Sequence, residues 1–325
     1  MMEKQFYIQK LKATIYKGYN LFRGRERKVS YGSENPNKIF YIIGQDDYTG
    51  GLFWIVNKAV MHIAYSIEKG WIPVIDYQHH TTQYTTSEMA GKTNIWEMFF
   101  QQPCGYSMGD IQRSKNIVIQ KMSPAPTPYY LMGQSEFYEN GERIAYFRNY
   151  FNRYIHFNQA TNRHLTDSYE RLFLNKGEII GVLCRGTDYM IQRPKGHYVQ
   201  PEPEMVIDDV KKLQKQHRGR QYVFLATEDA DIFQKFTDTF GDKLLSIPQK
   251  RISKNTMDNK LFLASQPIWH EDDAPIDKAL SYLTSMYLLS KCTYFFSGRT
   301  GGAKAVLLMN GNFKYKKIYN LGFYQ

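Results

Sequence analysis

Apolar strand-like segments that alternate with amphipathic helices are the feature that most restricts the folds open to this chain. Residues 38–44 (KIFYIIG) are a β-branched and aromatic run that ends in glycine, and residues 71–77 (WIPVIDY) are a second such run. Between them, after the turn containing Gly50 and Gly51, apolar residues recur at helical spacing over residues 52–69. This order predicts a right-handed βαβ unit and the start of a Rossmann-like half.

The second half shows the alternation more fully. Strands are predicted over residues 178–184, 221–226, near 244, 293–296 and 317–321, and helices over residues 202–216, 229–240, 277–290 and 301–309. Residues 117–119 suit a further strand, and residues 136–173 are mostly helical in pattern. The fold class is therefore α/β with doubly wound parallel sheets. A chain of 325 residues fits two domains, and we expect one over residues 31–173 and one over residues 174–325.

Basic residues are concentrated ahead of the first predicted strand. The net charge of the chain is +11, and residues 1–30 hold eight basic and two acidic residues, a net +6. Apolar side chains are interleaved with them, as in a helix that lies on an anionic membrane surface. A solvated basic arm fits the composition equally well. In either case residues 1–30 are predicted to form a separate N-terminal arm.

Cysteine usage and hydropathy bear on the compartment. Cys104, Cys184 and Cys292 are odd in number, far apart and without CxxC spacing, which favours a reducing compartment over a disulfide framework or a zinc module. No run approaches the roughly 20 apolar residues of a membrane-spanning helix, and the N-terminus lacks the apolar core of a signal peptide. We expect a cytoplasmic protein, held peripherally on the inner membrane face if the arm binds lipid.

Ligands of open α/β sheets bind beyond the carboxyl ends of the strands, so each strand-to-helix junction is a candidate site. Arg185 directly follows residues 178–184, and its planar guanidinium suits a diphosphate, although a structural Arg–Asp pair is the alternative. After residues 221–226 come Thr227, Glu228 and Asp229, which suit either a helix cap or contacts to a ribose or a base.

Two other junctions carry glycines. Ser297, Arg299, Thr300 and Gly301 lie between a predicted strand and a predicted helix, where hydroxyls, a guanidinium and free backbone N–H groups favour a phosphate over a plain tight turn. The Gly50-Gly51 turn is the corresponding but weaker junction of the first half.

Histidines and acids in loops offer further chemistry. His197 lies in the polar loop after Arg185 and suits a base, although a solvent-facing histidine is the commoner case. His79 and His80 are interpreted as solvent-facing, and Asp229 with Asp231 permits a metal site. The sequence contains no GxSxG, HExxH or P-loop motif.

Three segments together resemble the motifs of one family. Residues 181–189 (GVLCRGTDY), 222–229 (YVFLATED) and 280–310 are similar, in order, to the three motifs of the fucosyltransferase superfamily, which comprises α1,2-, α1,6- and protein O-fucosyltransferases. The Gly50-Gly51 turn matches the glycine turn of the acceptor half. The three C-terminal motifs together span about 40% of the chain.

The resemblance implies a GT-B architecture, in which two Rossmann-like domains face a cleft, and an inverting, metal-independent transfer from a nucleotide sugar. The implied donor is GDP-fucose, and no cofactor or metal is needed beyond this cosubstrate. Arg185 matches the motif arginine that holds the β-phosphate, and Asp188 matches the motif aspartate. Leu183 and Gly186 depart from the motif, which leaves another nucleotide sugar as an alternative.

The remaining motif positions are carried over in the same way. Glu228 and Asp229 match the acids of the second motif, and Ser297 and Thr300 match the hydroxyls on the phosphate side. A base must also take the proton of the acceptor hydroxyl. Asp188, His197 and Asp46 are the candidates, and the sequence does not choose among them.

The sequence therefore predicts a glycosyltransferase of the fucosyltransferase-like kind that acts on a glycan or lipid-linked saccharide in surface polysaccharide biosynthesis. A metal-dependent transferase is the alternative among enzymes. A basic nucleic-acid-binding protein is the alternative outside enzymes, since the pI is about 9.3 and the chain has 26 tyrosines. Because the basic charge is terminal and the sequence has no RRM, KH or zinc-finger signature, we expect no nucleic-acid partner.

Overall fold

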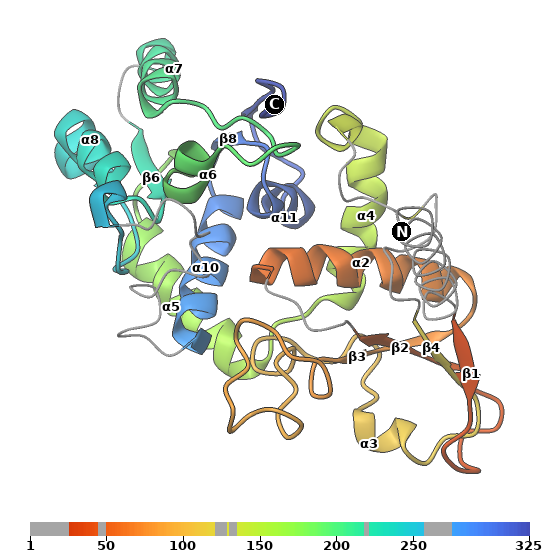
Figure 1. The fold of residues 1–325 in the computed structure, drawn as a ribbon. Helices are drawn as coiled ribbons and strands as arrows, with labels where there is room; N and C mark the ends of the chain where they lie inside the picture. Colours follow the sequence, from red (N-terminus) through yellow and green to blue (C-terminus); the bar gives the residue numbers. More distant parts are fainter. Residues whose placement is uncertain (1–25, 45–49, 121–128, 130–134, 218–220, 257–274) are drawn as a thin grey trace, which may run out of the picture.

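The computed structural model describes residues 26–44, 50–120, 129, 135–217, 221–256 and 275–325, and these residues form two α/β halves with one sheet each (Figure 1). The strands are β1 Arg27–Val29, β2 Phe40–Gly44, β3 Ile72–Asp76, β4 Ile117–Ile119, β5 Ile179–Leu183, β6 Tyr222–Ala226, β7 Leu244–Leu245, β8 Tyr294–Gly298 and β9 Tyr315–Tyr319. The helices are α2 Leu52–Glu68, α3 Met108–Ile111, α4 Gly141–Tyr154, α5 Gln159–Phe173, α6 Thr187–Gln192, α7 Pro203–Gln216, α8 Ala230–Phe240, α10 Pro275–Ser290 and α11 Gly301–Met309. Short 3-10 turns are η1 Ser135–Tyr138, η2 Gly241–Lys243 and η3 Lys254–Thr256.

The N-terminal sheet has the order β1-β4-β2-β3. Strand β2 pairs in parallel with β3 and with β4, and α2 connects β2 to β3 as the sequence predicts. Strand β1 pairs antiparallel with β4, with Arg27 opposite Ile119. This pairing corrects two expectations: the sheet is not purely parallel, and residues 27–29 belong to it instead of to the predicted arm. The rest of that arm, residues 1–25, lies outside the described residues.

The C-terminal sheet is fully parallel, with the order β7-β6-β5-β8-β9. When the five strands of this half are numbered along the chain, their order in the sheet is 3-2-1-4-5, as in a Rossmann fold. The direction in which successive strands are added to the sheet reverses between β5 and β8. Strand β9 begins at Tyr315, which pairs with Tyr294, and so lies two residues earlier than the sequence predicts. The predicted α/β class with two Rossmann-like sheets is confirmed.

Helices cover both faces of the C-terminal sheet, because neighbouring residues of a strand point to opposite faces. Ile180 and Val182 of β5 pack with α7 and α8 in one hydrophobic cluster. Ile179 and Leu183 of the same strand belong to another cluster, together with residues of α10 and α11. This alternation makes the half doubly wound.

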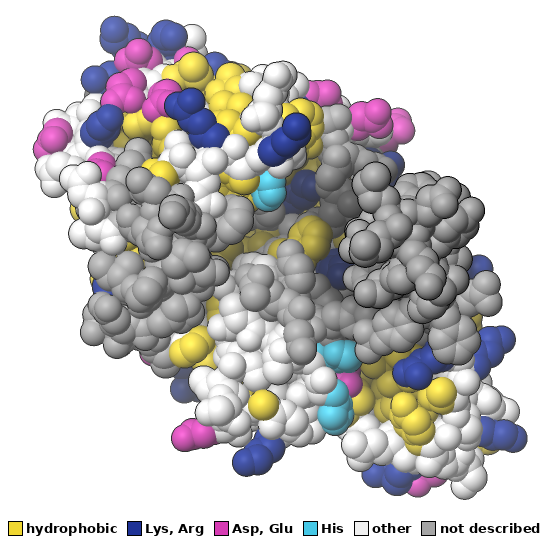
Figure 2. Space-filling model, viewed as in Figure 1, with side chains coloured by type: hydrophobic (Ala, Val, Ile, Leu, Met, Phe, Trp, Pro, Cys, Tyr) yellow, Lys and Arg dark blue, Asp and Glu magenta, His cyan; other side chains and the backbone are white. Residues whose placement is uncertain are grey.

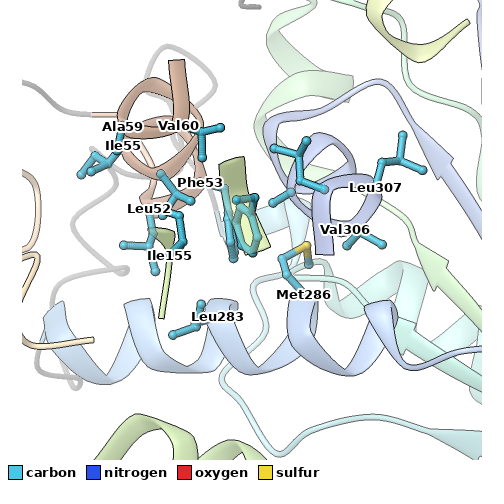
Figure 3. Packing of buried hydrophobic residues seen from close by; sticks show 14 of the residues in the cluster. Leu52, Phe53, Ile55, Ala59, Val60, Ile155, Leu283, Met286, Val306 and Leu307 are labelled. Carbon is cyan, nitrogen blue, oxygen red and sulfur yellow. The ribbon is translucent and has the colours of Figure 1, made fainter. Parts of the chain in front are cut away.

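The second cluster continues from the C-terminal half into the N-terminal half. Phe53 of α2, Met286 of α10 and Val306 of α11 are all buried within it, and Figure 3 shows their side chains turned toward one another. Helix α4 adds a polar contact, since the Arg148 guanidinium donates to the carbonyl of Leu307 at 2.8 Å. The two halves therefore share one core at the start of α2 and along α11.

In the part of the chain that the structure describes, no helix combines the length and the hydropathy needed to cross a membrane.

Candidate functional site

Strands β5, β6 and β8 end at the same edge of the C-terminal sheet, and the three predicted motif junctions follow them there. The strand order reverses at this edge between β5 and β8, where Rossmann-like sheets bind ligands. Figure 2 shows that the surface is hollowed between the two lobes and that Lys or Arg side chains lie in part of this hollow. The structure thus brings the predicted junctions together.

Arg185 lies at the tip of β5 and is half-buried. Its guanidinium carbon lies 4.2 Å from the centre of the Tyr189 ring, which is within the range of a cation–π interaction. The Tyr189 hydroxyl is also 3.1 Å from Nδ1 of the exposed His197. Tyr189 therefore connects two predicted site residues, and its only signal in the sequence is its place in the motif.

The turn after β5 is held by the two acids that follow β6. The backbone N–H of Thr187 donates to Asp229 Oδ2 at 2.9 Å, and the Thr187 hydroxyl donates to Glu228 Oε1 at 3.1 Å. The N–H of Gly186 donates to the same Glu228 oxygen at 3.3 Å. A Cβ at Gly186 would lie 2.2 Å from Asp229 Oδ2, so only glycine fits this approach. Glu228 and Asp229 thus set the conformation of the loop that presents Arg185.

Asp229, a predicted donor-binding residue, is fully buried. Its Oδ1 accepts the backbone N–H groups of Asp231 and Ile232 at 2.9 and 3.0 Å, which caps the N-terminus of α8. Because both of its oxygens accept backbone N–H groups, the geometry favours capping over the predicted Asp229–Asp231 metal pair. Thr227 is buried as well, and its hydroxyl accepts the N–H of Asp229 at 3.2 Å.

The junction after β8 contains two more capping residues. Ser297 is buried, and its hydroxyl donates a hydrogen bond to the carbonyl of Gly298 at 2.7 Å. Thr300 caps α11, since its Oγ1 accepts the N–H of Ala303 at 3.1 Å. The partly exposed Gly301 is the first residue of this helix, whose N-terminus carries partial positive charge.

Arg299 lies among aromatic and acidic side chains. It is buried, and the ring centres of Tyr138 and Tyr198 lie 5.4 and 5.5 Å from its guanidinium carbon. It also forms an ion pair with Glu139. Since Tyr138 and Glu139 precede α4, Arg299 links the two halves, and its contact with a donor diphosphate stays a prediction.

A buried lysine lies on the same helix. Burial lowers the pKa of Lys304 to about 8, and its Nζ lies 5.6 Å from the ring centres of Phe137 and Tyr138. The sequence gives no signal for this lysine, since its helical position predicts neither its burial nor its aromatic neighbours.

The Gly50-Gly51 turn lies beside the same helix terminus. Gly51 precedes α2 as its N-cap, and the first N–H of α2, that of Leu52, donates to the Tyr84 hydroxyl at 2.8 Å. From the next turn of α2, Asn57 Nδ2 donates to the carbonyl of Gly301 at 3.0 Å. The N-termini of α2 and α11 therefore meet, which brings the fourth predicted junction to the other three.

Two predicted base residues are outside what the structure describes. Asp46 lies in residues 45–49, and the side chain of Asp188 is not described.

At the end of β3, Asp76 Oδ2 lies 2.8 Å from Nδ1 of His79. The interpretation of His79 as merely solvent-facing is therefore incomplete, because a buried carboxylate orients its ring.

Among the residues with described side chains, no group of three or more His, Cys, Asp or Glu residues is arranged to hold a metal ion.

Comparisons with known proteins give structural similarities only. No family model matches the chain, and no curated protein sequence matches it. The chain is similar to solved fucosyltransferases. Fucosyltransferase NodZ from Bradyrhizobium has a TM-score of 0.48 and 15% identity over 84% of this chain and 94% of that one. NodZ α-1,6-fucosyltransferase soaked with GDP-fucose has a TM-score of 0.46 and 16% identity over 84% and 93%. POFUT1 in complex with GDP-fucose has a TM-score of 0.45 and 10% identity over 86% and 98%.

Proposed function

We propose that the chain is an inverting, metal-independent glycosyltransferase of the fucosyltransferase-like kind. The observation that carries the proposal is the position of Arg185 at the β5 tip, on the same sheet edge as the N-terminus of α11. A guanidinium and free helix N–H groups at one edge suit the diphosphate of a nucleotide sugar. The proposed donor is GDP-fucose, with another nucleotide sugar as the alternative.

The reaction is a single displacement at the anomeric carbon. The acceptor hydroxyl forms the new bond while the bond between that carbon and the β-phosphate oxygen breaks, so the configuration inverts. The leaving nucleoside diphosphate takes the electron pair, and Arg185 and the α11 terminus stabilise its charge. Glu228 and Asp229 contribute indirectly, because they hold the turn that follows Arg185.

A base takes the proton of the acceptor hydroxyl. His197, Asp188 and Asp46 stay the proposed candidates. His197 Nδ1 lies 3.1 Å from the hydroxyl of Tyr189, whose ring also lies against Arg185, so this candidate is close to the proposed phosphate site. The proposed acceptor is a glycan or lipid-linked saccharide of surface polysaccharide biosynthesis, and the proposed location is the cytoplasm, with residues 1–25 on an anionic membrane surface.

A nucleotide screen tests the proposal directly. GDP, UDP, ADP, CMP and their sugar conjugates are added to the purified chain, and the melting temperature is recorded. A ligand at 100 times its dissociation constant adds about 2.7 kcal/mol to the stability of the folded state. We expect stabilisation by GDP and GDP-fucose, whereas stabilisation by none of the nucleotides would contradict the proposal.

Removal of metal separates the two enzyme mechanisms. With a guanidinium and helix N–H groups available for the diphosphate, transfer should survive excess EDTA. Loss of transfer in EDTA that manganese or magnesium restores would instead support the metal-dependent alternative. Competition by DNA or RNA for the nucleotide site would favour the nucleic-acid alternative.

A further inference from the structure

Tyr282 of α10 lies where the three parts of the candidate site meet, although it belongs to no strand-to-helix junction. A Cβ at Gly302 would lie 2.6 Å from the Tyr282 hydroxyl oxygen, so this oxygen lies directly over the backbone at the start of α11. Leu183 Cδ2, from the last residue of β5, lies 3.3 Å from the same Cβ position. The hydroxyl is thus close to the α11 terminus and to the β5 tip.

The Tyr282 ring is held in place by the N-terminal half. It packs edge-on against Phe53 of α2, with ring centres 5.1 Å apart and planes at 77°. Met286 and Leu183 also lie within 3.3 Å of the same Gly302 Cβ position, so the surroundings of the ring are close-packed. The position of the hydroxyl is therefore fixed before any ligand arrives.

The polar groups around this point have no acceptor from the protein. Within the described part of the chain, the Tyr282 hydroxyl makes no hydrogen bond, and the N–H groups of Gly301 and Gly302 have no acceptor. Donors that converge on one point without an acceptor are the arrangement that an anion completes.

The protonation state of the hydroxyl suits this role. Burial raises the pKa of Tyr282 to about 12, so the group is a neutral donor at neutral pH and does not repel a phosphate. A carboxylate at this position would repel the anion, and a phenylalanine would offer no donor.

We propose that Tyr282 is a donor-binding residue whose hydroxyl donates a hydrogen bond to the β-phosphate, beside Arg185 and the N–H groups of Gly301 and Gly302. This role rests on the proposed function. This role also specifies the ligand class. A nucleoside monophosphate has only the α-phosphate, and a β-phosphate is needed to reach these hydrogen-bond donors. The nucleoside part of the donor is bound by other groups.

The test is Tyr282→Phe, which removes only the hydroxyl. The affinities for GDP and GMP are measured by calorimetry, and kcat and KM are measured for transfer. A hydrogen bond to a charged group is worth enough to weaken GDP binding about 10-fold or more, while GMP binding stays unchanged. We expect kcat to fall by at least the same factor and the acceptor KM to stay as in the wild type.

Tyr287→Phe is the matched control. Tyr287 lies on the same helix, packs against Phe157 and, like Tyr282, makes no hydrogen bond through its hydroxyl to a described residue. It should leave the ratio of GDP to GMP affinity unchanged. This ratio is measured within one preparation, so a partly unfolded variant still gives a usable value.

The outcomes distinguish this role from the proposed function. A wild-type protein that binds GDP and transfers sugar, with a Tyr282→Phe variant of equal GDP-to-GMP ratio and equal kcat, would overturn the role of Tyr282 alone. A wild-type protein that binds no nucleoside diphosphate would reject the proposed function and, with it, this role.

Discussion

Arg185 is the side chain on which the proposed chemistry depends most. We predict that Arg185→Lys lowers kcat/KM for transfer at least 100-fold, about 3 kcal/mol of transition-state stabilisation, with the melting temperature nearly unchanged. A lysine keeps the charge but has neither the flat face that stacks on Tyr189 nor two parallel donors. Steady-state kinetics and thermal unfolding measure both quantities.

Arg153→Lys is the control for this substitution. Arg153 also stacks on a tyrosine, with its guanidinium carbon 5.5 Å from the ring centre of Tyr154 on α4. Transfer by this variant should equal that of the wild type. If Arg185→Lys kept most of its activity, Arg185 would have no role in holding the phosphate.

Gly186 is the second residue at which we predict a strong effect, because the structure has no room for a side chain there. Gly186→Ala should destabilise the fold by about 1–3 kcal/mol and reduce transfer, because the new Cβ would lie 2.2 Å from Asp229 Oδ2 and displace the turn. Urea unfolding and transfer rates measure the two effects. Gly141→Ala, where nothing lies within 4 Å of the Cβ position, should be neutral, and equal stability of the two variants would refute the steric argument.

At the scale of elements, the contact between α4 and α11 joins the halves. The Arg148 side chain donates to the carbonyls of Leu307 and Asn310, at the end of α11 where helix carbonyls lack internal partners. Arg148→Leu should therefore cost about 1–3 kcal/mol of unfolding free energy and increase hydrogen exchange at the end of α11. The exposed Arg163 on α5 supplies the control, Arg163→Leu, and equal exchange in both variants would exclude the capping role.

At the scale of the whole molecule, the basic charge and the folded halves are separate features. Residues 1–25 contain six basic residues and one acidic residue, a net charge of +5, whereas β1 begins only at Arg27. Each basic residue near an anionic surface is worth about 1 kcal/mol. Deletion of residues 1–25, which spares β1, should abolish binding to anionic vesicles at low salt and leave transfer to a soluble acceptor nearly intact.

Co-sedimentation with vesicles and transfer assays on the same preparations check this prediction. Neutral vesicles are the control for binding without charge. A shortened chain that still bound anionic vesicles as well as the full chain would show that other residues attach the protein. A shortened chain without activity on a soluble acceptor would place residues 1–25 in the folded core.

The sequence alone determined the order of strands and helices and the positions of the junctions. The β5 and β6 segments and the start of α11 at Gly301 follow from patterns within a few residues, because hydrophobic periodicity is a local property. The sequence also predicts that the three junctions lie at one edge of the sheet, because the carboxyl ends of parallel strands are all on the same side.

Only the tertiary structure decided which junction side chains are available to a ligand. Asp229 and Ser297 are buried as local hydrogen-bond partners, and Arg299 is buried beside the ring of Tyr138 from the other half. The same holds for β1, which pairs with a strand about 90 residues later, and for Tyr282, which reaches α11 from a helix outside every junction. Burial and pairing depend on segments that are distant in the chain, and no local pattern encodes which of them meet.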